Sequence, residues 1–438
     1  TTVPRACAAL VLTVLVVTAP AAAAPSLSTG SSGVTATTST AASAISACTT
    51  IESSGAYELQ GNLTNASKAG CLEVRADDVV IDGNGYTIAP GSTPTNGAGV
   101  LVTNAQNVTI RNLSLSHWQT GISVRTADEL SLHALEIDDA AIAAVSITGV
   151  DDVSVTETRV TGSSDGIRMQ NVADATVARN ELHGLAATAI ELGSADETTV
   201  RNNTVTNSSG IGVSIAQGKS ILVVGNTLDR TADTAVDATG TQGLEITENV
   251  ITGTSGTGIR VNDSTEATVA ENTVSGNAFY GVVFNSVGQS ESSAASSMTK
   301  SDTNWGLRHY TTGHSSFRSV LDASWSRQLA QVVAGEVTDA SGIHNNTIRN
   351  NGRHGVVLFE SQRLSITENM VVRNKDGVRV VNSTSIRILD NGIHDSREEG
   401  LALGLSSQNT LHRNNVTDSG GDGVYVVGDE NDLTNNTM

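Results

Sequence analysis

Aromatic residues, lysines and positive charge are all scarce in this sequence. The 438 residues include only 12 Phe, Tyr and Trp side chains and four lysines, which are Lys68, Lys219, Lys300 and Lys375. Asp and Glu number 45 against 25 Lys and Arg, so the formal net charge is −20. This acidic balance argues against nucleic acid and anionic membrane surfaces as partners.

Cysteine is also rare, which limits the disulfide and metal chemistry that the chain can support. Cys7 lies in a segment with the features of a targeting signal, which leaves Cys48 and Cys71 as a pair. Two thiols without a nearby histidine argue against a metal site. They fit one disulfide bond formed in an oxidising compartment.

Ten-residue helical patterns are missing between Ala189 and Tyr280, and a repeat of 23 residues takes their place. Each repeat opens with a small residue. These openings are Ala189, Gly212, Ala235, Gly258 and Gly281. Short Val/Ile runs separated by Gly, Asn, Asp, Ser and Thr at a fixed period are typical of a solenoid whose repeats pack on one another.

Within one repeat the apolar residues form three small clusters. Ile190 and Leu192 form the first, Val200 the second and Val205 the third. Alternation of apolar and polar residues over such short runs predicts strands with one face inward. We therefore expect an all-β, right-handed parallel β-helix of about fifteen coils, where one coil is one winding of 22 or 23 residues.

Asparagine recurs fourteen residues after the opening position of each coil. Asn tolerates left-handed backbone conformations and hydrogen-bonds through its side chain. Identical asparagines at one turn are therefore expected to stack as a structural ladder along the axis. The predicted ladder residues are Asn180, Asn203, Asn226, Asn249, Asn272, Asn346, Asn369, Asn391 and Asn414.

The chain divides into six segments. Residues 1–24 have the pattern of a secretory signal peptide, with an apolar core too short to span a bilayer comfortably. The other segments are a Ser/Thr-rich linker (25–47), an N-terminal cap pinned by a Cys48–Cys71 disulfide (48–98), regular coils (99–280), an irregular aromatic-rich segment (281–331) and further coils (332–438). The chain stops within a repeat at Met438, so we expect a truncated C-terminus.

A family resemblance is carried by three elements, which are the segment GAYELQGNLT, the segment ADDVVIDGNGYTI and repeats of the form GIxVxxxxxxTVxxNxV. Together with the signal peptide, they resemble secreted right-handed β-helix proteins described as NosD-like or as carbohydrate-binding and sugar-hydrolase (CASH) domains. The resemblance covers about 48–438 except 281–331. The acidic, lysine-poor composition resembles secreted proteins of salt-loving archaea. These resemblances imply a secreted or cell-surface location.

The NosD resemblance implies a role in copper-enzyme maturation as one alternative function. Copper binds to clusters of His, Cys or Met, whereas the nine histidines of this chain are scattered. His309 and His314 are the closest pair in sequence. We therefore predict no metal site from the thiols or imidazoles.

The second residue after each opening is expected to point outward from the first strand. Over five coils this row, which we call the +2 row, contains Arg168, Glu191, Ser214, Asp237 and Arg260. Glu191 and Asp237 lie about 9.6 Å apart along the axis at the usual strand spacing. That separation is near the upper limit for the acid and base of an inverting glycosidase. Arg168 and Arg260 are candidates for binding uronate carboxylates.

The alternative interpretation of the +2 row is a solvated row of mixed charges. The sequence also lacks an Asp-Pro-His run like that of alginate epimerases and an Arg-x-Pro-x-x-Arg run like that of pectate lyases. Asp-Gly pairs at 165–166, 376–377 and 422–423 occupy turns, where this dipeptide is common. The row alone does not decide between an enzyme and a binding module.

The irregular segment contains an unusual share of the aromatic residues. Seven of the 12 lie between 279 and 325. Trp305, Tyr310 and Trp325 are candidates for a platform on which sugar rings stack. The alternative is two enlarged coils whose loop packs its own small core over the β-helix.

Calcium is the one cofactor that the acidic positions leave open. Glu248 and Glu271 stack in neighbouring coils, as do Glu368 and Asp390, and paired carboxylates can hold Ca²⁺. The alternative is an acidic coat. The preferred function is a secreted or cell-surface module that binds a polysaccharide or cell-envelope glycan. A glycosidase, lyase or epimerase acting on acidic polysaccharide, and a structural spacer, are the alternatives.

Overall fold

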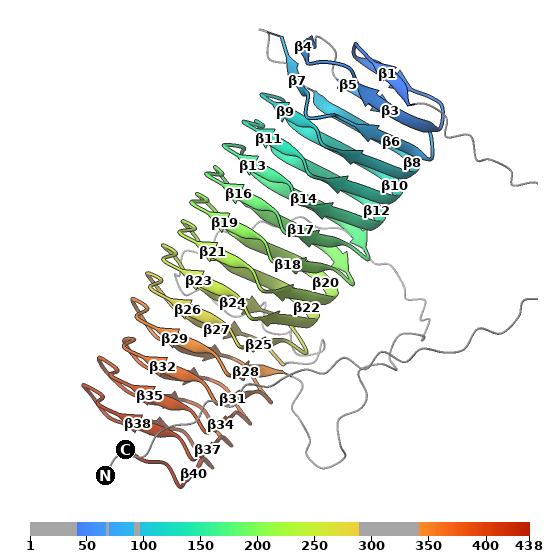
Figure 1. The fold of residues 1–438 in the computed structure, drawn as a ribbon. Helices are drawn as coiled ribbons and strands as arrows, with labels where there is room; N and C mark the ends of the chain where they lie inside the picture. Colours follow the sequence, from blue (N-terminus) through green and yellow to red (C-terminus); the bar gives the residue numbers. More distant parts are fainter. Residues whose placement is uncertain (1–41, 67–69, 92–96, 289–340) are drawn as a thin grey trace, which may run out of the picture. The chain divides into compact units, whose positions relative to one another are not determined.

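A computed structural model describes residues 42–66, 70–91, 97–288 and 341–438. In these ranges the chain forms a parallel β-solenoid with three strand faces and no helix (Figure 1). The predicted signal peptide and the linker up to residue 41 lie outside the described residues. No helix in the described ranges is long and apolar enough to cross a membrane.

Two sheets contain all the described strands. The first sheet has 26 strands and forms two faces of the solenoid, and the second sheet has 14 strands and forms the third face. The first face contains β2 (Thr49–Ile51), β5 (Gly70–Val74), β14 (Asp165–Ala173), β17 (Ile190–Asp196), β24 (Ile259–Asn262), β27 (Val282–Asn285), β30 (Val356–Phe359), β33 (Val378–Val381), β36 (Leu401–Gly404) and β39 (Val424–Val427). The second face contains β1 (Ser43–Ile45), β3 (Gly55–Leu59), β6 (Val79–Asp82), β15 (Thr176–Ala178), β18 (Thr199–Arg201), β25 (Thr268–Ala270), β28 (Gly342–His344), β31 (Ser365–Thr367), β34 (Arg387–Leu389), β37 (Thr410–His412) and β40 (Asp432–Thr434).

Five long strands continue around the corner from the first face to the second. They are β8 (Ala98–Arg111), β10 (Thr120–His133), β12 (Ala143–Thr156), β20 (Val213–Val224) and β22 (Val236–Thr247). The third face contains β4 (Leu63–Ala66), β7 (Thr87–Pro90), β9 (Ser114–Ser116), β11 (Glu136–Asp138), β13 (Arg159–Thr161), β16 (Glu181–His183), β19 (Thr204–Thr206), β21 (Thr227–Asp229), β23 (Val250–Thr252), β26 (Thr273–Ser275), β29 (Thr347–Arg349), β32 (Met370–Val372), β35 (Gly392–His394) and β38 (Asn415–Thr417). These fourteen strands indicate about 14 coils, one fewer than the sequence suggested.

The core lies inside the three faces and follows the alternation of the strands. In β24, Ile259 and Val261 point inward and are fully buried, while Arg260 and Asn262 point outward. The small opening residues have a steric cause. A Cβ at Gly258 would lie 2.5 Å from a Val274 methyl and 2.6 Å from the Gly281 carbonyl oxygen. Only a residue with little or no side chain fits where the chain enters the first face.

The asparagine ladder is continuous through the described coils from Asn180 onward. Each Nδ2 donates to the Oδ1 of the next asparagine at 2.9 to 3.0 Å, and the row continues beyond the predicted residues to Asn436. Each amide also donates to a backbone carbonyl, as Asn249 does to Val223 at 2.9 Å. Because these groups are buried, the ladder satisfies polar atoms that would otherwise destabilise the interior.

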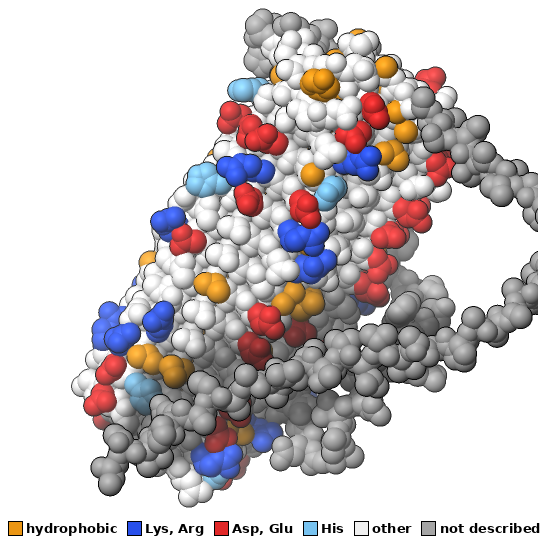
Figure 2. Space-filling model, in the orientation of Figure 1, with side chains coloured by type: hydrophobic (Ala, Val, Ile, Leu, Met, Phe, Trp, Pro, Cys, Tyr) orange, Lys and Arg blue, Asp and Glu red, His pale blue; other side chains and the backbone are white. Residues whose placement is uncertain are grey.

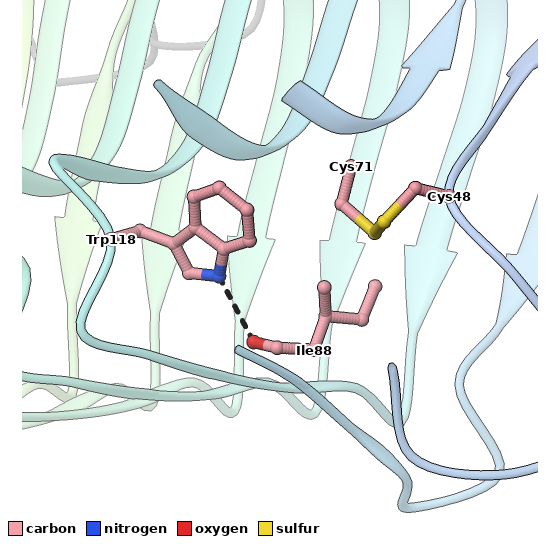
Figure 3. Close-up of a disulfide and its surroundings, with 4 residues drawn as sticks. All are labelled: Cys48, Cys71, Ile88 and Trp118. Carbon is pink, nitrogen blue, oxygen red and sulfur yellow. Dashed lines mark hydrogen bonds between the residues drawn. A yellow bond between two sulfur atoms is a disulfide. The ribbon is translucent and has the colours of Figure 1, made fainter. Parts of the chain in front are cut away.

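The N-terminal coils are joined by a disulfide between Cys48 and Cys71. The two residues are 23 apart in sequence and lie on neighbouring coils (Figure 3). Nearby, Trp118 is almost fully buried and its Nε1 donates to the Ile88 carbonyl at 3.0 Å. The predicted cap (48–98) itself consists of stacked coils, since β2, β5 and β8 pair in parallel. The first strand, β1, begins within the predicted linker and pairs with β3.

The strand pairing places β27 and β28 in a single coil. Strand β27 follows Gly281 in the regular register, and it pairs with β24 on one side and with β30 on the other. The second strand of that coil is β28, which pairs with β25 and β31. The next described strand after β27 is therefore β28, on the second face of the same coil. The predicted irregular segment beyond residue 288, with the two enlarged coils considered for it, lies outside the described residues.

Candidate functional site

The five residues of the +2 row are vertical neighbours on the first face. The strand register pairs Arg168 with Glu191, Glu191 with Ser214, Ser214 with Asp237, and Asp237 with Arg260. Their side chains point outward, because the residues on either side of them in each strand are buried. Charged side chains of both signs are interspersed over the face of the molecule shown in Figure 2.

The charged members of the +2 row pair with one another. Arg168 Nε donates to Glu191 at 2.8 Å, and its Nη2 lies 3.0 Å from Asp165. Arg260 binds Asp237 with both Nε and Nη2, at 2.8 and 2.5 Å. The Asp237 carboxylate supports the charge of the half-buried Arg260 guanidinium and raises its pKa, although burial opposes this effect.

This pairing engages every residue that the sequence proposed for acid–base or uronate chemistry along the row. Glu191 also accepts a hydrogen bond from Gln170 at 3.2 Å. The +2 row is thus a row of mixed charges in which each arginine pairs with a carboxylate of the neighbouring coil.

Other sequence predictions lie elsewhere on the chain. Trp305, Tyr310 and Trp325, together with His309 and His314, lie outside the described residues. Of the two acidic pairs considered for calcium, one is already engaged, because Asp390 forms a bidentate ion pair with Arg413 at 2.6 and 2.7 Å.

A cluster of rings and charges lies further along the flank of the first face, at the turns that precede β27, β30 and β33. We call it the flank cluster. It consists of Phe279, Tyr280, Arg353, His354 and Asp376. The Arg353 guanidinium carbon lies 5.0 Å from the centroid of the Phe279 ring and 5.8 Å from that of the Tyr280 ring. Phe279 is 42% exposed, so this part of the cluster faces solvent.

The interior side of the flank cluster is polar. The Tyr280 ring stacks on the His354 ring with centroids 5.6 Å apart. His354 Nδ1 lies 2.9 Å from Asp376 Oδ2, a close contact that lacks the alignment of a hydrogen bond. Arg379 Nη1 donates to the same oxygen at 2.9 Å. Asp376 is fully buried, so its charge depends on these two neighbours.

The surroundings of Asp376 favour its ionised form. Burial raises the pKa of this carboxyl group and is the largest single influence on it. The interactions with His354, Arg379 and Glu399 act in the opposite direction and together outweigh burial, so the pKa of Asp376 is well below its usual value. A buried ionised carboxylate beside a histidine, with a tyrosine ring stacked on that histidine, is an unusual group for a surface turn.

Sequence reasoning did not find the flank cluster. Asp376 was assigned to turn chemistry, and His354 and Arg353 fall outside the +2 row. A signal was present in the chain, since Tyr280, His354 and Asp376 each directly precede a coil-opening glycine. It was missed because residues 74 apart are neighbours across the inserted segment, and a strict 23-residue count does not place them side by side.

A family model described as a right-handed beta helix region matches residues 143–294 and 333–438. The match spans more than half of the chain, so the protein belongs to the right-handed β-helix family. A comparison with curated protein sequences found no match.

Several solved structures resemble the model at low sequence identity. The periplasmic alginate epimerase AlgG is 14% identical, with 79% of each chain covered and a TM-score of 0.47. The mannuronan C-5 epimerase AlgE4 A-module of Azotobacter vinelandii is 13% identical, with 87% of this chain and 90% of that chain covered and a TM-score of 0.45. PfbA, a surface adhesin of Streptococcus pneumoniae, is 12% identical, with 86% and 85% covered and a TM-score of 0.41. At these values we transfer neither residues nor activity from them.

Proposed function

We propose that this protein is a β-helix module that binds polysaccharide outside the cell or at the cell surface, with the flank cluster as the contact site. The observation that carries the proposal is the exposed Phe279 ring, with the partly buried Arg353 guanidinium over it and over the partly buried Tyr280 ring, on a rigid scaffold. Aromatic rings offer flat apolar faces, and a guanidinium donates several hydrogen bonds in a fixed plane. Both suit a sugar ring, which has apolar faces and a rim of hydroxyl groups.

The repeated scaffold supports this function physically. A β-helix presents residues of successive coils at a constant spacing of about 4.8 Å, so an extended chain of sugars can contact several coils. The coils are fixed by backbone pairing, and those from Asn180 onward also by the asparagine ladder, so little conformational entropy is lost at the surface on binding. Secretion, the NosD-like or CASH type and the salt-adapted composition belong to the same proposal.

Among the residues that the structure describes, no specific contact favours the alternatives. The group of carboxylates at Asp376, Glu398 and Glu399 offers oxygen ligands only, and copper prefers imidazole, thiolate or thioether ligands. Glu191 and Asp237 are engaged in ion pairs. We therefore keep the copper-maturation and enzyme readings as outcomes that an assay can reveal.

Binding of the full chain to a panel of neutral and uronate-containing polysaccharides tests the proposal. We expect Phe279→Ala and Arg353→Ala each to weaken binding roughly tenfold, since truncating a central aromatic or arginine contact costs more than 1 kcal/mol. Arg168→Ala is the matched control, because Arg168 is also on this flank but is held by Glu191 and Asp165. Retained affinity in both test variants would refute the assignment, and released products would identify an enzyme instead.

A further inference from the structure

We propose that Asp376, Glu398 and Glu399 form a calcium site that joins two neighbouring coils on the flank. Asp376 lies in the turn before β33, and the two glutamates lie in the turn before β36. The turns are adjacent, since the Gly377 amide donates to the Glu399 carbonyl at 3.1 Å and the Glu398 amide to the Lys375 carbonyl at 2.8 Å. This site shares Asp376 with the flank cluster, does not include the Phe279 and Tyr280 rings, and needs no bound glycan.

The spacing of the carboxylates fits one large cation. One oxygen from each of the three residues lies within 4.8 Å of the other two. Ca²⁺ binds oxygen at about 2.4 Å, so two ligands on opposite sides of one ion are about 4.8 Å apart. Calcium also tolerates irregular geometry and a mixture of protein and water ligands, whereas Mg²⁺ demands a compact octahedron. An open turn with three carboxylates therefore suits calcium better.

A second observation points to a ligand here. Asp376 is fully buried, and its Oδ2 is occupied by Arg379 and His354. Its other oxygen, Oδ1, is buried and has no hydrogen-bond partner among the residues that the structure describes. An unpartnered buried carboxylate oxygen is costly. The nearby groups on the next coil are the carboxylates of Glu398 and Glu399, which cannot donate a hydrogen bond to Asp376 Oδ1 when they are ionised. A bound cation would satisfy this oxygen.

Lys375 competes with the cation for one of the ligands. Its Nζ lies 3.1 Å from Glu398 Oε2, and both side chains are about half exposed. The lysine has a flexible stem and can move into solvent when an ion binds. Removing its charge therefore strengthens calcium binding, which is an effect that a purely structural role of these residues would not produce.

Calorimetric titration of the full chain with calcium chloride, in buffer treated with chelator and without any glycan, tests the site. We expect one ion per chain, and Glu398→Gln and Glu399→Gln each weaken binding roughly tenfold or more, since ligand charge sets the affinity. Lys375→Gln tightens it by roughly 2- to 5-fold, the worth of an exposed ion pair. Glu368→Gln, in the other acidic pair, is the control and leaves binding unchanged.

Three results would overturn the site. They are the absence of calcium binding to the native chain, weaker binding in Lys375→Gln, and loss of binding in Glu368→Gln with affinity retained in Glu399→Gln. The first result would indicate that the clustered carboxyl groups share a proton instead. Because no polysaccharide is present, none of these results bears on the proposed glycan function.

Discussion

Asp165 and Asp376 occupy the same position on the solenoid and have opposite electrostatic environments. Each precedes a coil-opening glycine, and each is bound by an arginine three residues later, at 3.0 and 2.9 Å. Burial is the largest influence on both and raises the pKa. At Asp165 the Thr188 amide and Arg168 do not overcome burial, to which Glu191 adds, and the pKa is raised. At Asp376 the contacts with His354 and Arg379 prevail, and the pKa is lowered.

The difference shows that the repeat determines the position of a side chain, while the residues of the neighbouring coil determine its pKa and its contacts. Asp165 is beside Ala143 and Thr188 in the adjacent coils, and Thr188 donates one backbone amide to it. The charge that the next coil brings near Asp165 is the carboxylate of Glu191, which disfavours its ionised form. Asp376 is beside His354 and Glu399. We therefore expect the coils around Asp165 to serve mainly as scaffold and the coils around Asp376 to bind the ligands.

The largest effect should come from the asparagine ladder, which both regions share. Asn249 and Asn369 each donate to two backbone carbonyls and to the next asparagine, and each accepts from the preceding one. We expect Asn249→Leu and Asn369→Leu each to cost about 3 kcal/mol or more, since several buried groups lose partners. Urea unfolding combined with hydrogen exchange measures the global and the local cost.

The control for the ladder is Asn262→Ala, because the Asn262 amide lies on the outer surface and makes one hydrogen bond of 3.3 Å. It should change the free energy of unfolding by less than about 0.5 kcal/mol. If Asn249→Leu and Asn369→Leu differ widely, the scaffold is not uniform. The contrast between the two aspartates would then reflect the stability of their coils as much as their neighbours.

The next effect separates the two aspartates directly. We expect Asp376→Asn to lower the free energy of unfolding by about 2 kcal/mol at pH 7, because a hydrogen bond to a charged group is lost in a buried turn. A depressed pKa stabilises the fold above the unfolded value of about 3.9, and this contribution disappears as the pH falls through the lower folded value. The gap between native chain and variant should therefore close in acid.

Urea denaturation of both chains at several pH values measures this gap. A constant difference from neutral to strongly acidic pH would show that the Asp376 charge does not stabilise the fold. The Arg379→Gln variant provides a cross-check, since it removes one partner of the carboxylate but leaves the aspartate in place. It should produce a smaller loss with the same dependence on pH, because Arg379 is 42% exposed.

The fold was predictable from the sequence because it depends on what every coil repeats. Ile259 and Val261 alternate with Arg260 and Asn262 as the period required, and the buried asparagines recur at one turn. The disulfide followed from the even pair Cys48 and Cys71. These features are local or strictly periodic, so counting along the chain finds them.

The flank cluster was not predictable by the same counting, because the 23-residue repeat is interrupted between Tyr280 and His354. Tyr280 and His354 stack although 74 residues separate them, and only the strand pairing of β27 with β30 reveals the contact. The +2 row was placed correctly in space, yet the sequence could not show that Arg260 would close on Asp237. Side-chain pairing between coils depends on rotamers and on neighbours that a repeat pattern does not encode.

A smaller effect of opposite sign is expected at Asp165. Its raised pKa means that the folded state disfavours the charge, so this group stabilises the fold below the unfolded value of about 3.9 and loses that contribution as the pH rises through the folded value. Asp165→Asn should therefore be neutral or raise the free energy of unfolding by less than about 1 kcal/mol at pH 7. An asparagine oxygen can still accept the Thr188 amide bond of 3.1 Å.

The measurement for Asp165 is the same pH series of urea denaturation, and the native chain and the variant should converge below about pH 4. A loss at pH 7 comparable to that of Asp376→Asn would remove the contrast. In that case the Arg168 contact would dominate burial at this turn.

The smallest effect is expected for the two carboxylates of the +2 row. Glu191→Gln and Asp237→Asn retain the shape of each side chain and remove one member of a partly exposed ion pair. Such pairs contribute about 1 kcal/mol or less, and neither residue belongs to the flank cluster, so polysaccharide affinity should change less than about twofold. Both variants are measured beside Arg353→Ala. A strong loss of affinity in either one would show that the polysaccharide binds at the +2 row. If the native chain releases a sugar product and either variant abolishes that release, the +2 row is catalytic.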